Sequence, residues 1–218
     1  MQNIFSYDSK VMRTLGMVSD VLLIGLLWLV CCLPVVTIGA SSTAAYYTIT
    51  KVVHKKMGYI TKEFIKSFKL NLKDATILTV VFVILGSLLA FNIYTMYTAL
   101  EDSESAFPIM MLFLYAALFV MLLCVMMYIF PALSRFTMGK MKLVRFSVST
   151  VFRHFISTPI LLAMLIVTVV IIIIFPIGVI FMPGVYLYIE SIVIEKILRK
   201  YMSGEMLDKW DELDSTVH

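Results

Sequence analysis

The chain has 218 residues, of which 61% are hydrophobic and only 15% are charged. A soluble domain of this size needs more charge to cover its surface, so this composition excludes an ordinary soluble protein and predicts an all-α, polytopic transmembrane helical bundle of about six helices in one integral membrane domain. The formal net charge of +4 is best explained as loop charge that orients the chain and meets anionic lipid headgroups, and we expect no nucleic-acid partner.

A mixed stretch precedes the first apolar segment. Residues 1–17 place Lys10 and Arg13 among apolar side chains, which predicts a short amphipathic helix lying on the membrane surface. Residues 18–33 form the first predicted span, which is slightly short for a bilayer but sufficient if its flanks contribute. Pro34 ends this helix, because proline supplies no N–H and restricts the residue before it.

A turn between two helices is predicted next, at or near a membrane face. Gly39 permits backbone angles that other residues resist, and hydroxyl side chains such as that of Ser41 can cap the following helix. After the turn, residues 41–55 carry several Thr and Tyr side chains, so they are either a second, bundle-facing span or a cytoplasmic continuation. The residues that define the turn motif are Leu33, Pro34, Thr37, Gly39 and Ser41.

Lysines crowd the segment 51–73, in which Glu63 is the single acidic residue. At about 100° per residue, four lysines fall on one helical face and two phenylalanines fall on the opposite side. Such a helix either lies on the cytoplasmic lipid surface or docks on a partner, or it is a solvated connector whose apolar underside packs on the protein's own bundle. The residues of this candidate docking helix are Lys62, Phe64, Lys66, Phe68, Lys69 and Lys73.

Further apolar segments follow, and the last of them is too long for one straight span. The run 158–188 contains Pro176, Gly178, Pro183 and Gly184, which predict two helices joined by a compact outer turn or a re-entrant piece. The tail after residue 203 is polar. The predicted elements of this part of the chain are spans at 75–97, 107–133, 159–175 and 184–198 and a polar tail at 203–218.

Loop charge predicts the orientation. Residues 98–106 carry acids without Lys or Arg, whereas residues 134–154 carry basic charge without acids, so the positive-inside rule places 98–106 outside and both 134–154 and 51–73 in the cytoplasm. If residues 41–55 cross the membrane, the protein has six spans with both ends inside. If they do not, it has five spans and an external N-terminus. We prefer six spans, because this arrangement keeps the N-terminal cations inside, and the C-terminus is cytoplasmic in both cases.

Three polar residues inside predicted spans are candidates for a substrate path or a helix–helix seam, namely Asp20, Asn92 and Glu190. A charged side chain in the bilayer centre costs at least about 2.5 kcal/mol, so such residues need a reason to be there. The alternative for Asp20 is a cap or a snorkelling position at the cytoplasmic boundary, and Glu195 can pair with Arg199 one helical turn later. Glu190 lies deepest among apolar neighbours.

The sequence predicts no catalytic or metal site. Its three cysteines lie in apolar runs without metal-ligand spacing, and His54 and His154 lie in basic segments without a Cys or acidic partner at metal spacing. Nucleotide-binding, GxSxG and HExxH patterns are missing from the sequence. We therefore expect a protein that is not an enzyme and that has no cofactor.

Three stretches of the sequence resemble one known family. They are CCLPVVTIGASSTAAYY at residues 31–47, FIKSFKLNLKDAT at residues 64–76 and PALSRF at residues 131–136. They are similar to the YesL family of bacterial membrane proteins, a family named as a domain of unknown function, and the likeness covers nearly the whole chain. The resemblance implies a multi-pass protein of the bacterial plasma membrane that is associated with carbohydrate uptake, and it implies no catalytic residues.

These features lead to two functional expectations. The first is an accessory membrane subunit or partner of a carbohydrate ABC transport system, since the chain lacks a nucleotide-binding motif and the coupling loop of the usual permease. Its partners would be membrane lipid and the permease subunits, and through them an ATPase and a solute-binding protein. The alternative is a stand-alone small-molecule transporter that uses helix breaks near residues 34–39 and 176–184, because broken helices often mark substrate sites.

Overall fold

The computed structural model describes residues 10–54, 58–102, 106–136 and 138–202, and every regular element within them is helical. Short 3₁₀ or π-helical turns adjoin the main helices. The main helices are α1 (Lys10–Cys31), α2 (Ile38–Thr48), α3 (Ile60–Asp102), α4 (Phe107–Arg135), α5 (Lys140–Arg153), α6 (Ser157–Ile174) and α7 (Gly178–Leu198). The short turns are η1 (Val35–Thr37, 3₁₀), η2 (Ile49–His54, π) and η3 (Arg199–Tyr201, 3₁₀).

Within the described residues, five helices are long and apolar enough to cross a membrane. They confirm the prediction, made from composition, of a polytopic helical membrane protein. Only a minority of the residues in these spans are buried within the isolated chain, which is the pattern expected where lipid covers the surface. The candidate spans are Thr14–Cys31, Ile60–Leu100, Phe107–Arg135, Ser157–Ile174 and Gly178–Tyr201.

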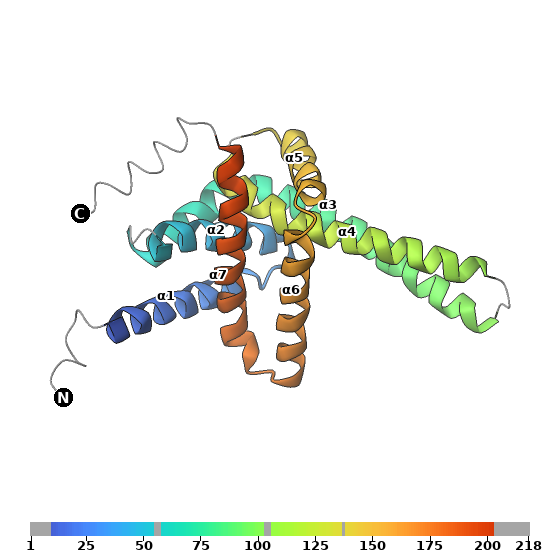
Figure 1. Ribbon diagram of the computed structural model, residues 1–218, viewed down its shortest axis with the longest axis horizontal. Helices are drawn as coiled ribbons and strands as arrows, with labels where there is room; N and C mark the ends of the chain where they lie inside the picture. Colours follow the sequence, from blue (N-terminus) through green and yellow to red (C-terminus); the bar gives the residue numbers. More distant parts are fainter. Residues whose placement is uncertain (1–9, 55–57, 103–105, 137, 203–218) are drawn as a thin grey trace.

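Two helical hairpins extend in different directions from one region of the molecule, which we call the base (Figure 1). Helices α3 and α4 lie side by side, and their joined ends extend away from the rest of the molecule. Helices α6 and α7 form the second hairpin, which is closed by a tight turn between Ile174 and Gly178. Helices α1, α2 and α5 surround the base, so polar groups from several parts of the sequence meet there.

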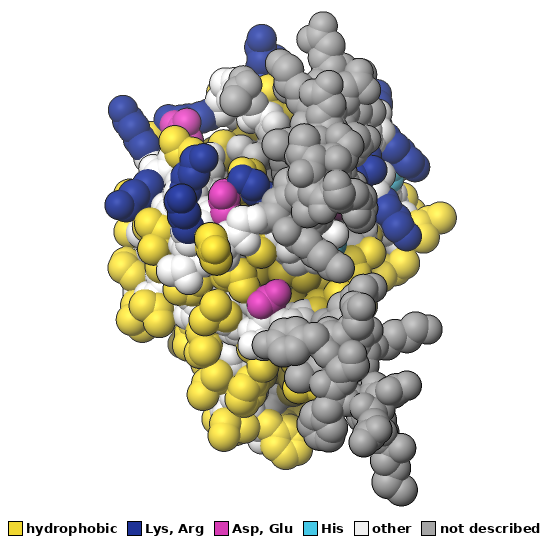
Figure 2. All heavy atoms as spheres, turned by 90° about the vertical axis from the view of Figure 1, so that its left-hand side faces the viewer, with side chains coloured by type: hydrophobic (Ala, Val, Ile, Leu, Met, Phe, Trp, Pro, Cys, Tyr) yellow, Lys and Arg dark blue, Asp and Glu magenta, His cyan; other side chains and the backbone are white. Residues whose placement is uncertain are grey.

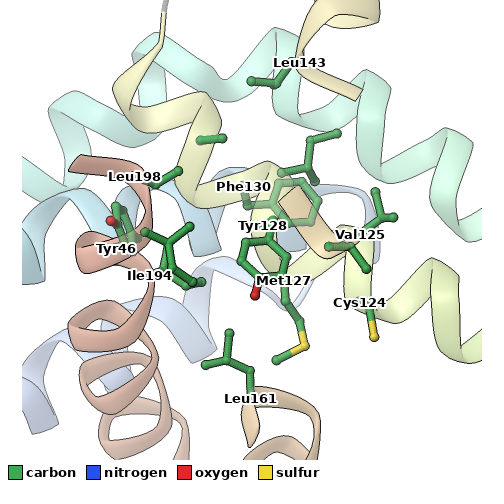
Figure 3. Packing of buried hydrophobic residues seen from close by; sticks show 14 of the residues in the cluster. Tyr46, Cys124, Val125, Met127, Tyr128, Phe130, Leu143, Leu161, Ile194 and Leu198 are labelled. Carbon is green, nitrogen blue, oxygen red and sulfur yellow. The ribbon is translucent and has the colours of Figure 1, made fainter. Parts of the chain in front are cut away.

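The main core lies where α4 meets α5, α6 and α7 (Figure 3). Tyr128 and Ile129 are fully buried in it, together with Leu143 of α5, Leu161 of α6 and Ile194 of α7. The Tyr128 hydroxyl forms a 3.1 Å hydrogen bond with the Thr158 hydroxyl, so its polar end is satisfied. Side chains from four helices thus pack in one apolar cluster, and this cluster holds the two hairpins together.

Helix α2 runs antiparallel to the first half of α3. The Gly39 N–H donates a 3.2 Å hydrogen bond to the Thr79 hydroxyl, and near the other end the Lys51 ammonium lies 2.8 Å from the Glu63 carboxylate. The two segments therefore lie at the same depth. Because exposed lysines line this half of α3, we expect it to lie outside the hydrocarbon, together with α2 beside it.

The contacts favour the five-span arrangement, which the sequence left open as an alternative to six spans. Residues 41–54 belong to α2 and η2, which pack largely buried against α3 and are not among the five candidate spans. Its Thr hydroxyls are satisfied within the helix, as Thr43 donates to the Gly39 carbonyl and Thr48 to the Ala44 carbonyl. The cytoplasmic continuation that the sequence left open as an alternative is what the contacts favour.

Some predicted boundaries also differ. The residues from Lys10 onward belong to α1 instead of a separate surface helix, and the docking helix and the span 75–97 are one continuous 43-residue helix, α3. Helix α7 begins at Gly178, so Pro183 lies inside it, where a span tolerates proline if neighbouring groups satisfy the freed carbonyl. Residues 1–9 and the predicted tail 203–218 lie outside the described residues.

Five crossings place the two ends of the chain on opposite sides of the membrane. We expect an epitope fused before residue 1 to react with a membrane-impermeant reagent in intact cells, and an epitope fused after residue 218 to react only after permeabilisation. An epitope within residues 98–106 serves as the external control. Protection of both terminal epitopes in intact cells would show that α2 crosses as a sixth span.

Helices α1 and α7 approach closely at two glycines. A Cβ atom placed on Gly184 would lie 2.5 Å from the Val21 carbonyl oxygen, and one on Gly25 would lie 2.9 Å from the Gly184 backbone. Small residues at such crossings let two backbones pack directly, which is a common source of association between helices in membranes. The two helices can pack this closely because neither Gly25 nor Gly184 has a side chain.

Replacing Gly184 by alanine should separate the two helices, because a backbone carbonyl cannot move aside as a flexible side chain can. Overpacking of this kind costs about 2 kcal/mol, so Gly184→Ala should lower the thermal unfolding temperature of the detergent-purified protein. The matched control is Gly86→Ala in α3, where the new Cβ would make ordinary contacts with a Leu122 methyl group at 3.6 Å and the Phe119 ring at 4.0 Å. Equal melting temperatures for the two variants would contradict this account.

Candidate functional site

The turn motif positions α2 on the bundle. Helix α1 ends at Cys31, and the Thr37 hydroxyl lies 2.6 Å from the Cys31 carbonyl and 2.7 Å from the Pro34 carbonyl, so it satisfies acceptors at the end of the helix. Leu33 is exposed, whereas Ser41 is fully buried. The predicted turn between two helices is present, and Thr37 caps the end of α1. The predicted hydroxyl cap of α2 is absent, because the N-cap residue Thr37 makes no side-chain cap bond to α2 and Ser41 lies inside that helix.

Gly39 has a steric role in place of the predicted backbone freedom, because it lies inside α2, and among the described glycines the positive φ belongs to Gly58. A Cβ atom at this position would lie 2.2 Å from both the Phe130 ring and the Thr79 hydroxyl oxygen. Any side chain would therefore push α2 away from α3 and α4. The sequence alone could place a turn here, but it could not show that the glycine sits against two distant helices.

The three polar candidates have different surroundings. Asn92 lies on the extended part of the α3–α4 hairpin, and its amide donates a 2.8 Å hydrogen bond to the Leu88 carbonyl of its own helix. Asp20 is half-buried on α1. Glu190 is only 6% exposed and is the one of the three that lines a cavity. The structure thus singles out Glu190 and does not bring the three residues together around one site.

The cavity beside Glu190 has a volume of about 290 Å³ and lies between α1, α2, α4, α6 and α7. Its walls are mostly apolar, with Met126, Met127 and Phe130 from α4 and Leu165 from α6. None of its lining residues is basic, and Glu190 is the only acidic one. We name this space the Glu190 cavity.

Other polar side chains in the wall already have partners. The Trp28 indole N–H donates a 3.0 Å hydrogen bond to the Ser42 hydroxyl, and the Tyr46 hydroxyl donates a 2.7 Å hydrogen bond to Glu195. Tyr186 lies one turn before Glu190 on α7 and lines the same cavity. The wall therefore offers one carboxyl group, with a tyrosine one turn before it, in apolar surroundings.

An ion-pair network lies next to the cavity. The Arg135 guanidinium is 2.8 Å from one Glu195 oxygen, and the Arg199 guanidinium is 3.5 Å from the other, which confirms the predicted pairing of Glu195 with Arg199. Arg135 also lies over the Tyr46 ring, 5.6 Å from its centroid. Burial raises the pKa of the Tyr46 phenol well above its usual value despite the nearby Arg135 charge, so the phenol stays protonated and donates to Glu195.

This network was not predicted in full. Arg135 was treated as a cytoplasmic cation that orients the chain, although it lies in the PALSRF stretch, and its side chain is only 2% exposed. Tyr46 was one of several polar residues in an ambiguous segment. The only available sequence signal was the arginine directly after a long apolar run, because its partner is 60 residues away.

Removing the Glu195 charge should destabilise the protein strongly. Breaking a buried pair leaves the Arg135 charge uncompensated, which costs about 3–5 kcal/mol, so Glu195→Gln should unfold at much lower temperature or denaturant concentration. The control is Asp74→Asn, which removes the exposed pair with Lys140 and should cost less than about 1 kcal/mol. A Glu195→Gln protein as stable as the Asp74→Asn protein would refute a structural role for the network.

The predicted docking helix forms the first part of α3, and its two faces are used differently. Phe64 is fully buried against α1 and α2, and Phe68 packs beside it with the two rings 6.4 Å apart. The apolar underside therefore packs on the protein's own bundle. This agrees with the interpretation of the segment as a connector whose underside packs on the bundle. The four lysines of the predicted docking helix are all exposed: Lys62, Lys66, Lys69 and Lys73.

Comparison with known proteins adds one match. A model of the family described as "Protein of unknown function, DUF624" matches residues 21–93, about a third of the chain. This part contains the turn motif, α2 and the basic face of α3, but it does not reach α4–α7. No curated protein and no solved structure matches. The match supports a relationship to an uncharacterised domain family over the first part of the chain.

Proposed function

We propose that the protein is a non-catalytic accessory partner of a bacterial carbohydrate ABC transport system in the plasma membrane. The observation that carries this proposal is the exposed basic face of α3, formed by Lys62, Lys66, Lys69 and Lys73, which we name the α3 lysine face. The choice of a carbohydrate permease as the partner rests on the resemblance of the turn and PALSRF motifs to the YesL family.

The α3 lysine face has the properties of a docking surface. Its helix is fixed to the bundle by Phe64, so little order is lost when a partner binds. Large apolar side chains are exposed on the same half-helix, with Ile65 at 43% and Leu70 at 74%. Exposed apolar area combined with one sign of charge favours a partner that presents an acidic, partly apolar surface.

Helix α5 extends this surface. The Lys140 ammonium lies 3.0 Å from the Asp74 carboxylate, so α5 begins beside the end of the α3 lysine face. Lys142 and Arg145 of α5 are exposed, while Leu143 anchors the helix in the core. Figure 2 shows Lys and Arg side chains gathered on the upper part of one side of the molecule and hydrophobic side chains below them. The basic residues thus form one broad region at one end of the protein.

A second candidate function is a stand-alone small-molecule transporter. The Glu190 cavity favours it, because an apolar cavity with one buried carboxyl inside a membrane protein is a typical substrate site. The accessory role ranks first because the large exposed basic surface is not needed by a protein that works alone.

Affinity purification from the native membrane tests the proposal. We expect the tagged full-length protein to recover permease and ATPase subunits in fixed ratio, and Lys66→Glu/Lys69→Glu to reduce their recovery by about tenfold through charge repulsion. The matched control is Lys200→Glu, a charge reversal at an exposed lysine of η3 outside the α3 lysine face. Recovery of the folded protein alone, with purified protein transporting a solute in liposomes, would replace the accessory role by the transporter.

A further inference from the structure

We infer that the Glu190 cavity binds a small lipophilic organic cation, with the cationic group at the Glu190 carboxylate and the apolar body against α4 and α6. This inference does not depend on the accessory role, because the cavity and the α3 lysine face are different surfaces. It rests on the volume and lining of the cavity and on the charge of the one acidic group in its wall.

The size and lining of the cavity suit a small organic molecule. A volume of about 290 Å³ is close to the lower end of the range of small-molecule sites, which are mostly apolar with a few polar groups that fix orientation. Met126 and Met127 supply flexible, polarisable side chains that adapt to an irregular apolar body. The single carboxyl would then fix which end of the ligand points towards α7.

Charge decides the kind of ligand. Glu190 is 6% exposed, and the described residues that line the cavity include no Lys, Arg or His. The nearest acidic group on the same helix, Glu195, differs in this respect because Arg135 and Arg199 pair with it. An ionised carboxylate in apolar surroundings is costly unless a cation accompanies it, and without one the carboxyl takes up a proton, so a cationic ligand would favour the ionised form of Glu190 and bind to it.

Aromatic side chains of the wall add a second preference for positive charge. Trp28, Tyr46 and Tyr186 all line the cavity. The polar ends of Trp28 and Tyr46 are hydrogen-bonded to Ser42 and Glu195, which holds these side chains in place. Aromatic rings attract ammonium groups, and the attraction is strongest where water is excluded. An organic ammonium ion can therefore use both the carboxylate and the rings.

A metal ion fits the same cavity poorly. Hard cations such as Ca²⁺ require six or more oxygen ligands, and the described residues contain no group of three His, Cys, Asp or Glu side chains that could hold a metal. The wall offers one carboxyl, two phenols and two aliphatic hydroxyls, and Ser42, Tyr46 and Thr168 already take part in hydrogen bonds within the protein, so too few oxygen atoms remain. The chemistry of the wall thus selects an organic cation over an inorganic one.

The test compares two probes that differ in charge but hardly in shape, benzyltrimethylammonium and its neutral isostere neopentylbenzene (2,2-dimethylpropylbenzene). Their binding to the purified full-length protein is measured by equilibrium dialysis in nanodiscs of zwitterionic lipid, with empty nanodiscs as the blank. We expect the cation to bind at least about tenfold more tightly than the isostere, as for a desolvated charge pair. Equal affinities would overturn the inference.

Variants locate the site. Glu190→Gln should abolish the preference for the cation and retain binding of the neutral probe, whereas Asp20→Asn, which removes a carboxyl of α1 outside the cavity wall, should leave the preference unchanged. Val169→Phe fills the cavity from an exposed position of α6 and should weaken binding of both probes. If the cation still bound tightly to folded Glu190→Gln or Val169→Phe protein, its binding site would lie outside the Glu190 cavity. Because no partner protein is present, these results are independent of the co-purification experiment.

Discussion

The ion pair between Arg135 and Glu195 holds the base of the molecule together. It joins the end of α4 to α7, and the Tyr46 hydroxyl brings α2 to the same carboxylate. A pair that is almost fully buried is costly to separate, since either charge alone would remain in apolar surroundings. The two hairpins can therefore diverge in the membrane while their bases stay in register, and the positions of α2 and of the cavity depend on this junction.

The same network explains why two glutamates on one helix have different environments. Glu195 faces the arginines at the base, whereas Glu190 lies just over one turn earlier and lines an apolar cavity. Neutralising Glu195 within the protein leaves Glu190 as the acidic group available to a ligand in that cavity. A structural carboxylate and a candidate binding carboxylate are thus distinguished by their neighbours, although both were visible in the sequence as acids near the end of a span.

The sequence was sufficient for the fold class, for most helix positions and for the two faces of the basic helix, because these depend on local composition and periodicity. The sequence did not decide questions that depend on long-range packing. The polar residues of 41–55 fitted either a bundle-facing span, which we preferred, or a cytoplasmic continuation, and the contacts of Gly39 and Lys51 with α3 favour the continuation. Arg135 and Glu195 are 60 residues apart, so their pairing has no local pattern that could reveal it.

Helix α2 connects the two surfaces to which function is assigned. Tyr46 lines the Glu190 cavity, and its hydroxyl donates a hydrogen bond to Glu195. One turn later, the Lys51 ammonium lies 2.8 Å from the carboxylate of Glu63, on the half of α3 that carries the lysine face. A ligand that shifts Tyr46 would move the same short helix against α3. Coupling between two sites requires an element that contacts both and has more than one arrangement. The segment α2–η2 meets the first requirement through Tyr46 in α2 and Lys51 in η2, and the π-helical form of η2 is often found at functional positions in helices.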